Sequence, residues 1–360
     1  MKDAESLDLV KKIGMDRVPG GHAVRPVYRR ISFGAAYPAT GIIKFLGYYD
    51  STFNIANMPS VSMVTDFSEA YAAFVLTEES GNDSVVFNGI EDERLMARSM
   101  RAIHLFRSIY SINGSFHLYV EIRKKYQRAT GLGESAAISA AAARSVARSV
   151  FDGSANEDAP FLSRIARLAS GYGAASVTGP ISVWISGPGL VHDTSFAAGL
   201  SVPDTGMAIC AVPIEMDLGS LDIHAAAMRS PFYNIFASYQ RRAVSDFLSA
   251  QIDADALIRV ATNNTLLTHS VLMSSYMLLW TEETIEIVRR ILEMRSKGYP
   301  VGISIDGGPS VVVMARNAAE LEKIEKYISG RCVHGKIASG EPELPRDFAR
   351  IAEENLGHYL

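Results

Sequence analysis

The order of apolar and polar positions along the chain predicts strands and helices that follow one another from end to end. Short apolar or alternating runs bounded by Gly, Pro, Asn or Asp are typical of strands, and apolar positions three or four residues apart are typical of helices. The strand pattern occurs at about 31–50, 61–64, 71–76, 84–87, 116–122, 181–186, 207–214 and 331–337. The helical pattern occurs at about 92–109, from 135 onward, and at 161–168, 233–251, 281–298 and 317–330. The small-residue stretch 169–180 is expected to be a loop.

The C-terminal part of this pattern indicates the fold class. Two predicted strands flank the turn Gly307-Gly308-Pro309, and a helix and a last strand complete a β-β-α-β arrangement. Helices that alternate with hairpins indicate an α+β protein whose helices pack against sheets. At the other end, residues 1–30 carry charges, Pro19 and Gly20, and are predicted to form a short helix followed by an extended arm.

Composition and charge narrow the class of protein. A chain of 360 residues is long enough for two domains with buried cores. The net charge of −4 gives no electrostatic argument for nucleic acid or an anionic membrane as a partner, and no apolar run reaches the ~18 residues of a membrane span. Cys210 and Cys332 lie far apart in sequence, which argues against a disulfide scaffold and fits a reducing cytoplasm. We expect a cytoplasmic protein in which both cysteines are small buried apolar residues.

The segment GLGESAA, residues 131–137, opens a strongly predicted helix. Glycines allow the backbone to come close to a ligand, and a helix N-terminus offers free N–H groups and a positive dipole end. Phosphate is the ligand expected at such a site. The spacing alone is weak evidence, and the segment lacks the Gly-Lys-Ser/Thr of a P-loop.

Four segments in order give this loop a context. GLGESAA resembles the Gly-Leu-Ala-Ser-Ser-Ala loop of the mevalonate diphosphate decarboxylases, a family of the GHMP kinase superfamily. YPATGIIKFLGYYD (37–50), SGYGAASVTGPISVW (170–184) and GYPVGISIDGGPSVVV (298–313) resemble three further motifs of that family. The resemblance implies a GHMP-kinase-like two-domain fold with mixed sheets and helices, and a homodimer. It places an N-terminal domain at 1–200, with 1–30 as an arm, and a ferredoxin-like C-terminal domain at 201–360.

The resemblance also implies two catalytic residues. Lys44 falls on the family's lysine near the reacting carboxylate, and Asp306 falls on its catalytic aspartate. By themselves, Lys44 could be a strand lysine that extends its amine to solvent, and Asp306 could be a turn former before Gly307.

Several positions depart from the family pattern. Glu134–Ser135 replaces a Ser-Ser pair in the phosphate loop, and a carboxylate there would oppose nucleotide phosphates unless a magnesium ion lay between them. Ala175 replaces an arginine that reaches the substrate's carboxylate in the family. Tyr48 replaces a lysine that helps to hold the 5-diphosphate, and Ala39 replaces an asparagine. These changes indicate that the ATP and 5-diphosphate sites have been remodelled.

The family's reaction has two halves: ATP phosphorylates the 3-hydroxyl, and the 3-phosphate and CO2 are then lost. Retained catalytic residues beside a remodelled ATP site predict that this chain catalyses the second half alone. The mevalonate 3,5-bisphosphate decarboxylases of acid-loving archaea resemble this combination. We therefore expect decarboxylation of mevalonate 3,5-bisphosphate to isopentenyl phosphate, CO2 and inorganic phosphate, without ATP, metal or another cofactor. An ATP-dependent decarboxylase in which Glu134 binds magnesium is one alternative. A GHMP-type mevalonate kinase relative, or a non-catalytic binding protein, is the other.

The substrate-binding candidates are polar residues in or near the matched motifs. Each has a structural alternative: packing for the tyrosines, and an exposed helix-end charge for the arginine. The basic cluster 123–128 is better explained as an exposed charged run than as a substrate-steering patch. The histidines lack metal-ligand spacing, so no metal site is expected. The candidates are Tyr37, Tyr48, Glu134, Ser135, Ser170, Arg229 and Ser230.

Overall fold

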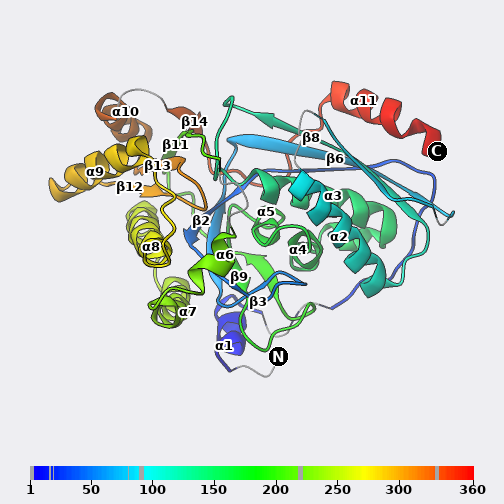
Figure 1. Cartoon of the computed structure of the whole chain (residues 1–360), viewed down its shortest axis with the longest axis horizontal. Coiled ribbons are helices and arrows are strands. Elements are labelled where there is room, and N and C mark those ends of the chain that lie inside the picture. Colours follow the sequence, from blue (N-terminus) through cyan, green and yellow to red (C-terminus); the bar gives the residue numbers. More distant parts are fainter. Residues whose placement is uncertain are drawn as a thin grey trace.

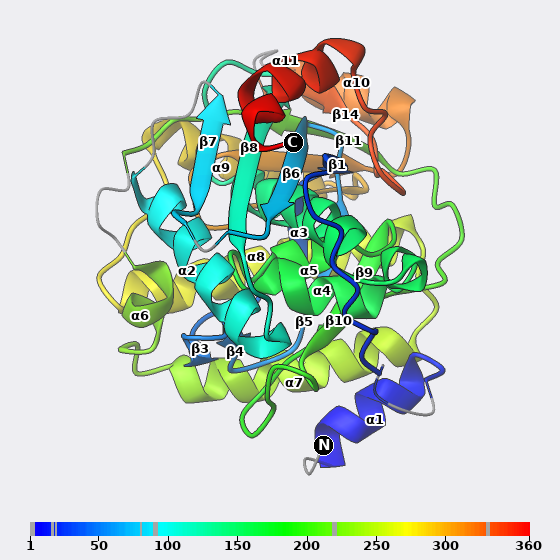
Figure 2. The same ribbon diagram turned by 90° about the vertical axis from the view of Figure 1, so that its right-hand side faces the viewer.

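In the described residues, three four-stranded sheets, one two-stranded sheet and the helices packed on them make up the molecule (Figures 1 and 2). The computed structural model describes residues 4–15, 18, 20–79, 81–88, 93–217, 222–328 and 332–360. The strands are β1 (Ser32–Ala36), β2 (Ala39–Ile43), β3 (Tyr48–Asp50), β4 (Ile55–Ala56), β5 (Ser60–Val64), β6 (Ser68–Thr77), β7 (Ser84–Asn88), β8 (Ser115–Lys124), β9 (Ile181–Ile185), β10 (Phe196–Gly199), β11 (Ala208–Val212), β12 (Val301–Ser304), β13 (Val311–Ala315) and β14 (Val333–Gly335).

The helices lie between and outside these sheets. They are α1 (Ala4–Lys12), α2 (Glu93–Tyr110), α3 (Glu134–Val150), α4 (Ala159–Arg167), α5 (Gly173–Ser176), α6 (Ile223–Ala227), α7 (Tyr233–Ser249), α8 (Ala254–Ser274), α9 (Glu282–Ser296), α10 (Ala318–Tyr327) and α11 (Arg346–Leu356). Two short 3₁₀ turns follow α3 and α11, at Gly153–Asn156 and Gly357–Tyr359. Among the described helices, none has the length and apolar character needed to cross a bilayer.

The first sheet, in the order β1-β6-β8-β7, is covered on both faces. Strand β6 is almost continuously apolar because its alternate side chains enter two different cores. Ala72 and Phe74 pack in the core that contains the α3 residues, whereas Tyr71 and Ala73 pack with Phe348 of α11. Figure 2 shows α11 above this sheet and α3 behind it.

Helix α8 joins the second and third sheets. The second sheet has the order β10-β9-β5-β2, and α8 packs against its edge strand β2 as well as against β12 of the third sheet. The ends of β2 and β12 therefore meet beside one helix. This junction positions the site described below.

The third sheet confirms the predicted ferredoxin-like half. Its strand order is β12-β13-β11-β14 with all neighbours antiparallel, which is the 4-1-3-2 order of a β-α-β-β-α-β unit read from β14. Helices α9 and α10 pack on one face through a shared apolar core. The predicted division into domains at residue 200 stays a prediction, although the first two sheets use only strands before it and the third only strands after it.

Some elements differ from the expectation. The predicted loop 169–180 contains the short helix α5, and the helices α6, α8 and α11 and the strand β10 had not been predicted. Helix α8 carries polar residues at buried positions, among them Asn264, Thr265 and His269, so its apolar period is weak. The predicted helix stop at Gly330 and strand start at Arg331 lie outside the described residues.

Candidate active site

Lys44 and Asp306 lie together although they are 262 positions apart in sequence. The distance from Lys44 Nζ to Asp306 Oδ1 is 3.8 Å, and the side chains are 2% and 11% exposed, respectively. Lys44 follows β2 and Asp306 follows β12, so the junction of the two sheets brings them together. The burial of the lysine excludes the alternative in which its amine extends to solvent.

The Lys44 ammonium has an acceptor for each of its three protons. It donates to the carbonyl of Gly41 at 2.9 Å, to Thr265 Oγ1 at 3.0 Å and to Ser304 Oγ at 2.9 Å. Ser304 in turn donates to the Gly41 carbonyl at 2.7 Å. An ammonium has three donors and no acceptor. Lys44 is therefore held as a fixed positive charge and does not donate a hydrogen bond to Asp306.

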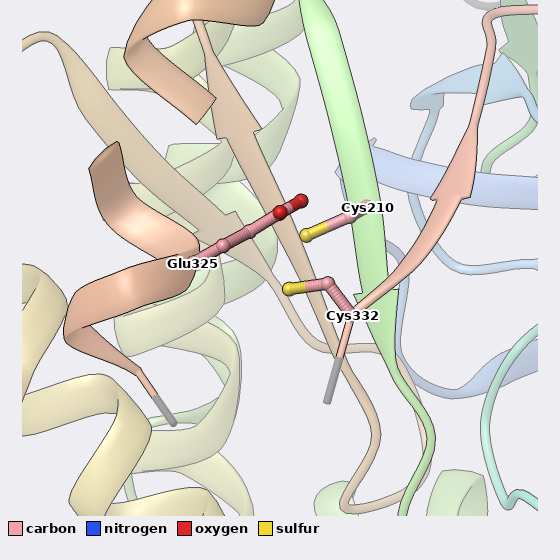
Figure 3. A group of neighbouring side chains, drawn as sticks. All are labelled: Cys210, Glu325 and Cys332. Atoms are coloured by element: carbon pink, nitrogen blue, oxygen red, sulfur yellow. The ribbon is translucent and has the colours of Figure 1, made fainter. Parts of the chain in front are cut away.

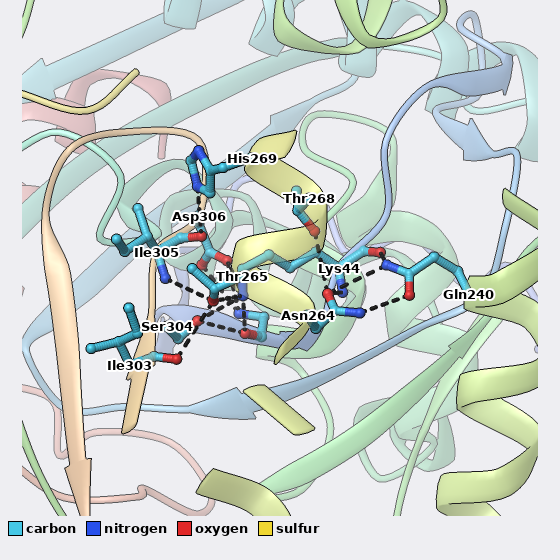
Figure 4. Close-up of polar contacts among 11 residues, drawn as sticks. Lys44, Gln240, Asn264, Thr265, Thr268, His269, Ile303, Ser304, Ile305 and Asp306 are labelled. Atoms are coloured by element: carbon cyan, nitrogen blue, oxygen red, sulfur yellow. Dashed lines mark hydrogen bonds and ion pairs between the residues drawn. The ribbon is translucent and has the colours of Figure 1, made fainter. Parts of the chain in front are cut away.

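The main chain of Lys44 is also fixed from both sides (Figure 4). Its N–H donates to Asn264 Oδ1 at 2.8 Å, and its carbonyl accepts from Gln240 Nε2 at 2.6 Å. The two amides are joined because Asn264 Nδ2 donates to Gln240 Oε1 at 2.7 Å. Helices α7 and α8 thus fix the residue that carries the buried charge.

Asp306 accepts hydrogen bonds from the backbone on the other side of the site. The Gly41 N–H lies 3.2 Å from Asp306 Oδ1 and 3.1 Å from Oδ2. The preceding carbonyl, that of Ile305, lies 3.2 Å from His269 Nε2. Burial lowers the pKa of His269 to about 4, so the ring is neutral near pH 7 and donates its Nε2–H to that carbonyl. His269 therefore supports the loop that carries Asp306 and adds no charge.

Gly41 allows three side chains to meet. A Cβ built on Gly41 would lie 2.8 Å from Asp306 Oδ1, 2.8 Å from Lys44 Cγ and 2.8 Å from the hydroxyl oxygen of Tyr172. Only a residue without a side chain fits there. The Tyr172 pKa is raised well above its usual value by burial and then by the negative charge of Asp306, so its hydroxyl stays protonated.

Burial moves the pKa values of the charged pair toward each other. It lowers the pKa of Lys44 to about 8, although the nearby Asp306 carboxylate acts in the opposite direction. It raises the pKa of Asp306, and there the Lys44 charge and the Gly41 N–H oppose the effect. The site thus holds an ammonium that loses its proton more readily than an exposed lysine, beside a carboxylate that takes up a proton more readily than an exposed aspartate.

The predicted phosphate loop packs directly on the loop of Asp306. A Cβ on Gly131 would lie 2.7 Å from the Gly308 nitrogen, and a Cβ on Gly133 would lie 2.6 Å from the Ala39 carbonyl. Gly131 and Gly133 also have φ angles of +92° and +78°. These glycines are therefore required by close approach of protein backbone and by the left-handed conformation.

Glu134 begins α3 with its carboxylate already bound. Lys124 Nζ lies 2.6 Å from Glu134 Oε2, and the Tyr126 hydroxyl donates to Oε1 at 2.7 Å. A carboxylate is favoured at this helix end by the dipole. Ser135 Oγ lies 3.5 Å from Ser170 Oγ, so the two predicted serines are brought together beside Tyr172.

Tyr48 and His224 belong to an aromatic group next to Gly171. The Tyr48 ring lies 4.5 Å from the His224 ring, which stacks on Phe45 at 4.9 Å. His224 Nδ1 accepts from the Gly47 N–H at 3.2 Å, and burial lowers its pKa to about 4, so it is neutral near pH 7. Burial raises the pKa of Tyr48 to about 12.

The structure does not bring the other predicted binding residues to Lys44 and Asp306. The Tyr37 hydroxyl interacts with the carboxylates of Glu69 and Asp66, which with burial raise its pKa. Arg229 is exposed. The buried Ser230 hydroxyl lies 2.6 Å from Ser274 Oγ and accepts from the Phe232 N–H, so it stabilises the start of α7. Their roles in substrate binding stay predictions.

The basic cluster is balanced by acids. Arg123 bonds Glu121 and Asp347, and the next three basic residues each have one acidic partner. Local pairing agrees with an exposed charged run and does not indicate a steering patch. The remaining pairs are Lys124–Glu134, Lys125–Asp66 and Arg128–Glu215.

The two cysteines meet at β11 and β14 of the third sheet, not at its edge strand β12, which leads to Asp306. Cys210 of β11, Cys332 just before β14 and Glu325 of α10 direct their side chains toward one another (Figure 3). One ligand atom from each lies within 4.8 Å of the others, a group that could hold a metal ion. Cys210 is buried, as expected. Cys332 is partly exposed, so the expectation of a buried residue was wrong there.

Several site residues had not been predicted. Tyr172 and Ser304 lie inside the matched motifs, and an examination of every polar position in those motifs would have found them. Gln240, Asn264 and Thr265 come from α7 and α8, which carry no matched motif. Only the packing of α8 between two sheets reveals them.

The fold is that of the solved mevalonate diphosphate decarboxylases, which confirms the predicted GHMP-kinase-like fold. The solved structure of mevalonate diphosphate decarboxylase from Staphylococcus aureus superposes on it with a TM-score of 0.75 at 20% identity, over 87% of this chain and 97% of that one. The family model described as diphosphomevalonate decarboxylase-like N-terminal domain matches residues 36–197.

Two sequence relatives are more specific. The chain is 32% identical over 348 residues to mevalonate 3,5-bisphosphate decarboxylase of Thermoplasma acidophilum, which covers 96% of this chain and 86% of the relative. It is 30% identical over 310 residues to the enzyme of the same name from Thermoplasma volcanium, over 86% of this chain and 83% of that one. The chain belongs to the diphosphomevalonate decarboxylase-like family, which confirms the resemblance of the four motifs.

Proposed function

We propose that this protein is a carboxy-lyase that converts mevalonate 3,5-bisphosphate to isopentenyl phosphate, CO2 and inorganic phosphate without ATP. The observation that carries the proposal is the buried pair of Lys44 and Asp306, whose charged atoms lie 3.8 Å apart. The names of the two Thermoplasma relatives support the same substrate.

The reaction balances without a proton donor or a cofactor. The bond between C3 and its phosphate oxygen breaks with its electron pair on the oxygen, and positive charge develops at C3. The electron pair of the bond between C2 and the carboxylate carbon then forms the C2=C3 double bond, and CO2 leaves. The Asp306 carboxylate is suited to stabilise the charge at C3, because a preorganised charge in a partly dry site requires little rearrangement.

The substrate enters already phosphorylated on its 3-oxygen in this proposal. No hydroxyl proton then needs a base, so Asp306 acts through its charge. Lys44 keeps Asp306 ionised and, with its protons bound to protein acceptors, holds the two loops in place.

One feature supports independence from ATP. Glu134 places a carboxylate at the start of α3, where Lys124 and Tyr126 bind it, so it is not free to hold magnesium without breaking those bonds.

Phosphate release from mevalonate 3,5-bisphosphate, measured with and without ATP and magnesium, tests the proposal. We expect equal rates in both conditions, and no release from mevalonate 5-phosphate or 5-diphosphate. Release from either of these only with ATP would replace the proposal by an ATP-dependent decarboxylase. We also propose a cytoplasmic homodimer, for which sedimentation at several protein concentrations is the test of assembly.

A further inference from the structure

The Tyr48 hydroxyl lies against the segment that leads to the catalytic carboxylate. A Cβ on Gly171 would lie 2.8 Å from this hydroxyl oxygen. The next residue, Tyr172, interacts electrostatically with both Asp306 and Tyr48. Tyr172 would therefore separate a substrate group beside Tyr48 from the reacting carbon beside Asp306.

Arg98 of α2 lies near enough to Tyr48 for its charge to act on the hydroxyl, and it has no partner among the described residues. Its Nε atom is buried and makes no hydrogen bond, and none of its nitrogens forms a hydrogen bond or ion pair with a residue in the described ranges. Its charge acts on the Tyr48 hydroxyl more strongly than any other charge there. A partly buried guanidinium without an acceptor is unfavourable unless an anion binds it.

Other arginines show that this state is unusual in the described part of the chain. Four more have a buried Nε without an acceptor, but their terminal nitrogens bond carbonyls or carboxylates. These four are Arg107, Arg144, Arg164 and Arg167. Among these five guanidinium groups, Arg98 is therefore the one that has no acceptor in the described ranges.

The charge around Tyr48 favours an anion. Besides Arg98, the guanidinium groups of Arg101 and Arg167 act on its hydroxyl, and the carboxylate of Asp222 acts in the opposite direction. Arg167 already donates hydrogen bonds to backbone carbonyls, whereas the Arg101 side chain is exposed.

The packing of α2 places Arg98 beside the rest of the site. Its neighbour Ser99 lines the same small cavity as Ser135 of α3 and Ala169. Ala169 precedes Ser170 and Gly171, over which the Tyr48 hydroxyl lies. The electrostatic effect of Arg98 on the Tyr48 hydroxyl and the position of Ser99 in this cavity both place Arg98 near residues 169–171.

We propose that Arg98 binds the 5-phosphate of the substrate beside the Tyr48 hydroxyl, with Arg101 adding positive charge. The inference rests on the proposed function for the identity of the substrate. The guanidinium fork matches two phosphate oxygens, and the phenol adds a third donor. The phosphate that leaves belongs near Asp306, so the one at Arg98 is the phosphate that remains in the product.

A cycle of one substitution and one substrate truncation tests this assignment. We expect Arg98→Gln to raise the KM for mevalonate 3,5-bisphosphate about 10- to 100-fold, with kcat within about threefold of wild type. With mevalonate 3-phosphate, which lacks the 5-phosphate, wild type and variant should have equal kcat/KM. Arg98→Lys, which keeps the charge, should recover part of the loss. Arg350→Gln is the matched control, because it removes the same charge from exposed α11, where it pairs with Glu354.

Binding of 3-methylbutyl phosphate, measured by calorimetry, separates this inference from the proposed function. This alkyl phosphate cannot react, and its affinity should fall about 10- to 100-fold in Arg98→Gln and stay unchanged in Arg350→Gln. If the wild type releases no phosphate from the bisphosphate but shows this loss of affinity, the function fails and the anion site stands. If turnover is normal and Arg98→Gln keeps wild-type KM and affinity, or both variants lose them equally, the assignment is wrong.

Discussion

The Lys44 ammonium lies 3.8 Å from Oδ1 of Asp306, and yet it donates its three hydrogen bonds to other groups. The pair is thus held by protein on both sides, because the Gly41 N–H donates a hydrogen bond to the carboxylate and the Gly41 carbonyl accepts one from the lysine. Each charge is in place before substrate arrives. Preorganisation of this kind is what a reaction through a developing cation requires.

Asp306→Asn removes the charge and keeps the shape of the side chain. We expect kcat to fall about 10²- to 10³-fold, the usual loss when a preorganised electrostatic group is removed, while calorimetry shows substrate still bound. Asp204→Asn, at an exposed turn, is the control and should keep full activity. Turnover within a few-fold of wild type would show that the Asp306 charge has no part in the chemistry.

The rate should depend on pH through both members of the pair. Asp306 must be ionised, so kcat/KM should rise as pH increases through its pKa, which burial places above 3.8. Lys44 must stay protonated, so kcat/KM should fall as pH increases through about 8. Phosphate release between pH 4 and pH 10 measures both limbs. The Tyr48→Phe variant should keep the fall in kcat/KM at alkaline pH, because the Tyr48 pKa of about 12 lies too high to cause it. If kcat/KM of the wild type stays constant up to pH 10, the assignment to Lys44 is wrong.

Asn264→Ala should destabilise the protein more than the same substitution at the adjacent Asn263. It leaves the buried N–H of Lys44 and one amide of Gln240 without their partners, which costs about 1–3 kcal/mol in the free energy of unfolding. Asn263→Ala changes the same residue type at the adjacent, exposed position of α8 and should change that free energy by less than about 0.5 kcal/mol. Urea unfolding of both variants decides; equal losses would mean that the Asn264 amide does not hold Lys44.

Gly41→Ala should abolish activity and leave the fold intact. The new methyl group would lie 2.8 Å from an oxygen of Asp306, from Tyr172 and from Lys44, so these side chains must separate. Gly153→Ala, where a Cβ meets nothing within 4 Å, is the control. Phosphate release together with circular dichroism would show the effect, and a fully active Gly41→Ala enzyme would mean that the close convergence is unnecessary.

The parts of the fold with a strong local signal could be predicted from sequence. The β-β-α-β unit around Asp306 is one, because its turn glycines, its helix caps and its apolar strands agree with one another. Helix α8 is the opposite case. Its buried Asn264 and Thr265 are polar because they bond Lys44, so the requirements of the site weaken the helical pattern from which the helix would be recognised.

The same limit applies to the residues of the site. Lys44 and Asp306 could be chosen because they stand in matched motifs. Arg98 stands in none, and nothing in its sequence neighbourhood distinguishes it from the other arginines of α2. Its lack of an acceptor is a property of the packed molecule, which no local pattern contains.

The backbone contact between Gly131 and Gly308 has an evolutionary consequence. Neither position can gain even a methyl group unless the opposite loop moves, so a substitution at one site would be harmful until the other loop changed too. We expect descendants of this chain to keep both glycines or to alter both loops together, and laboratory selection for activity after Gly131→Ala should yield second-site changes near residue 308.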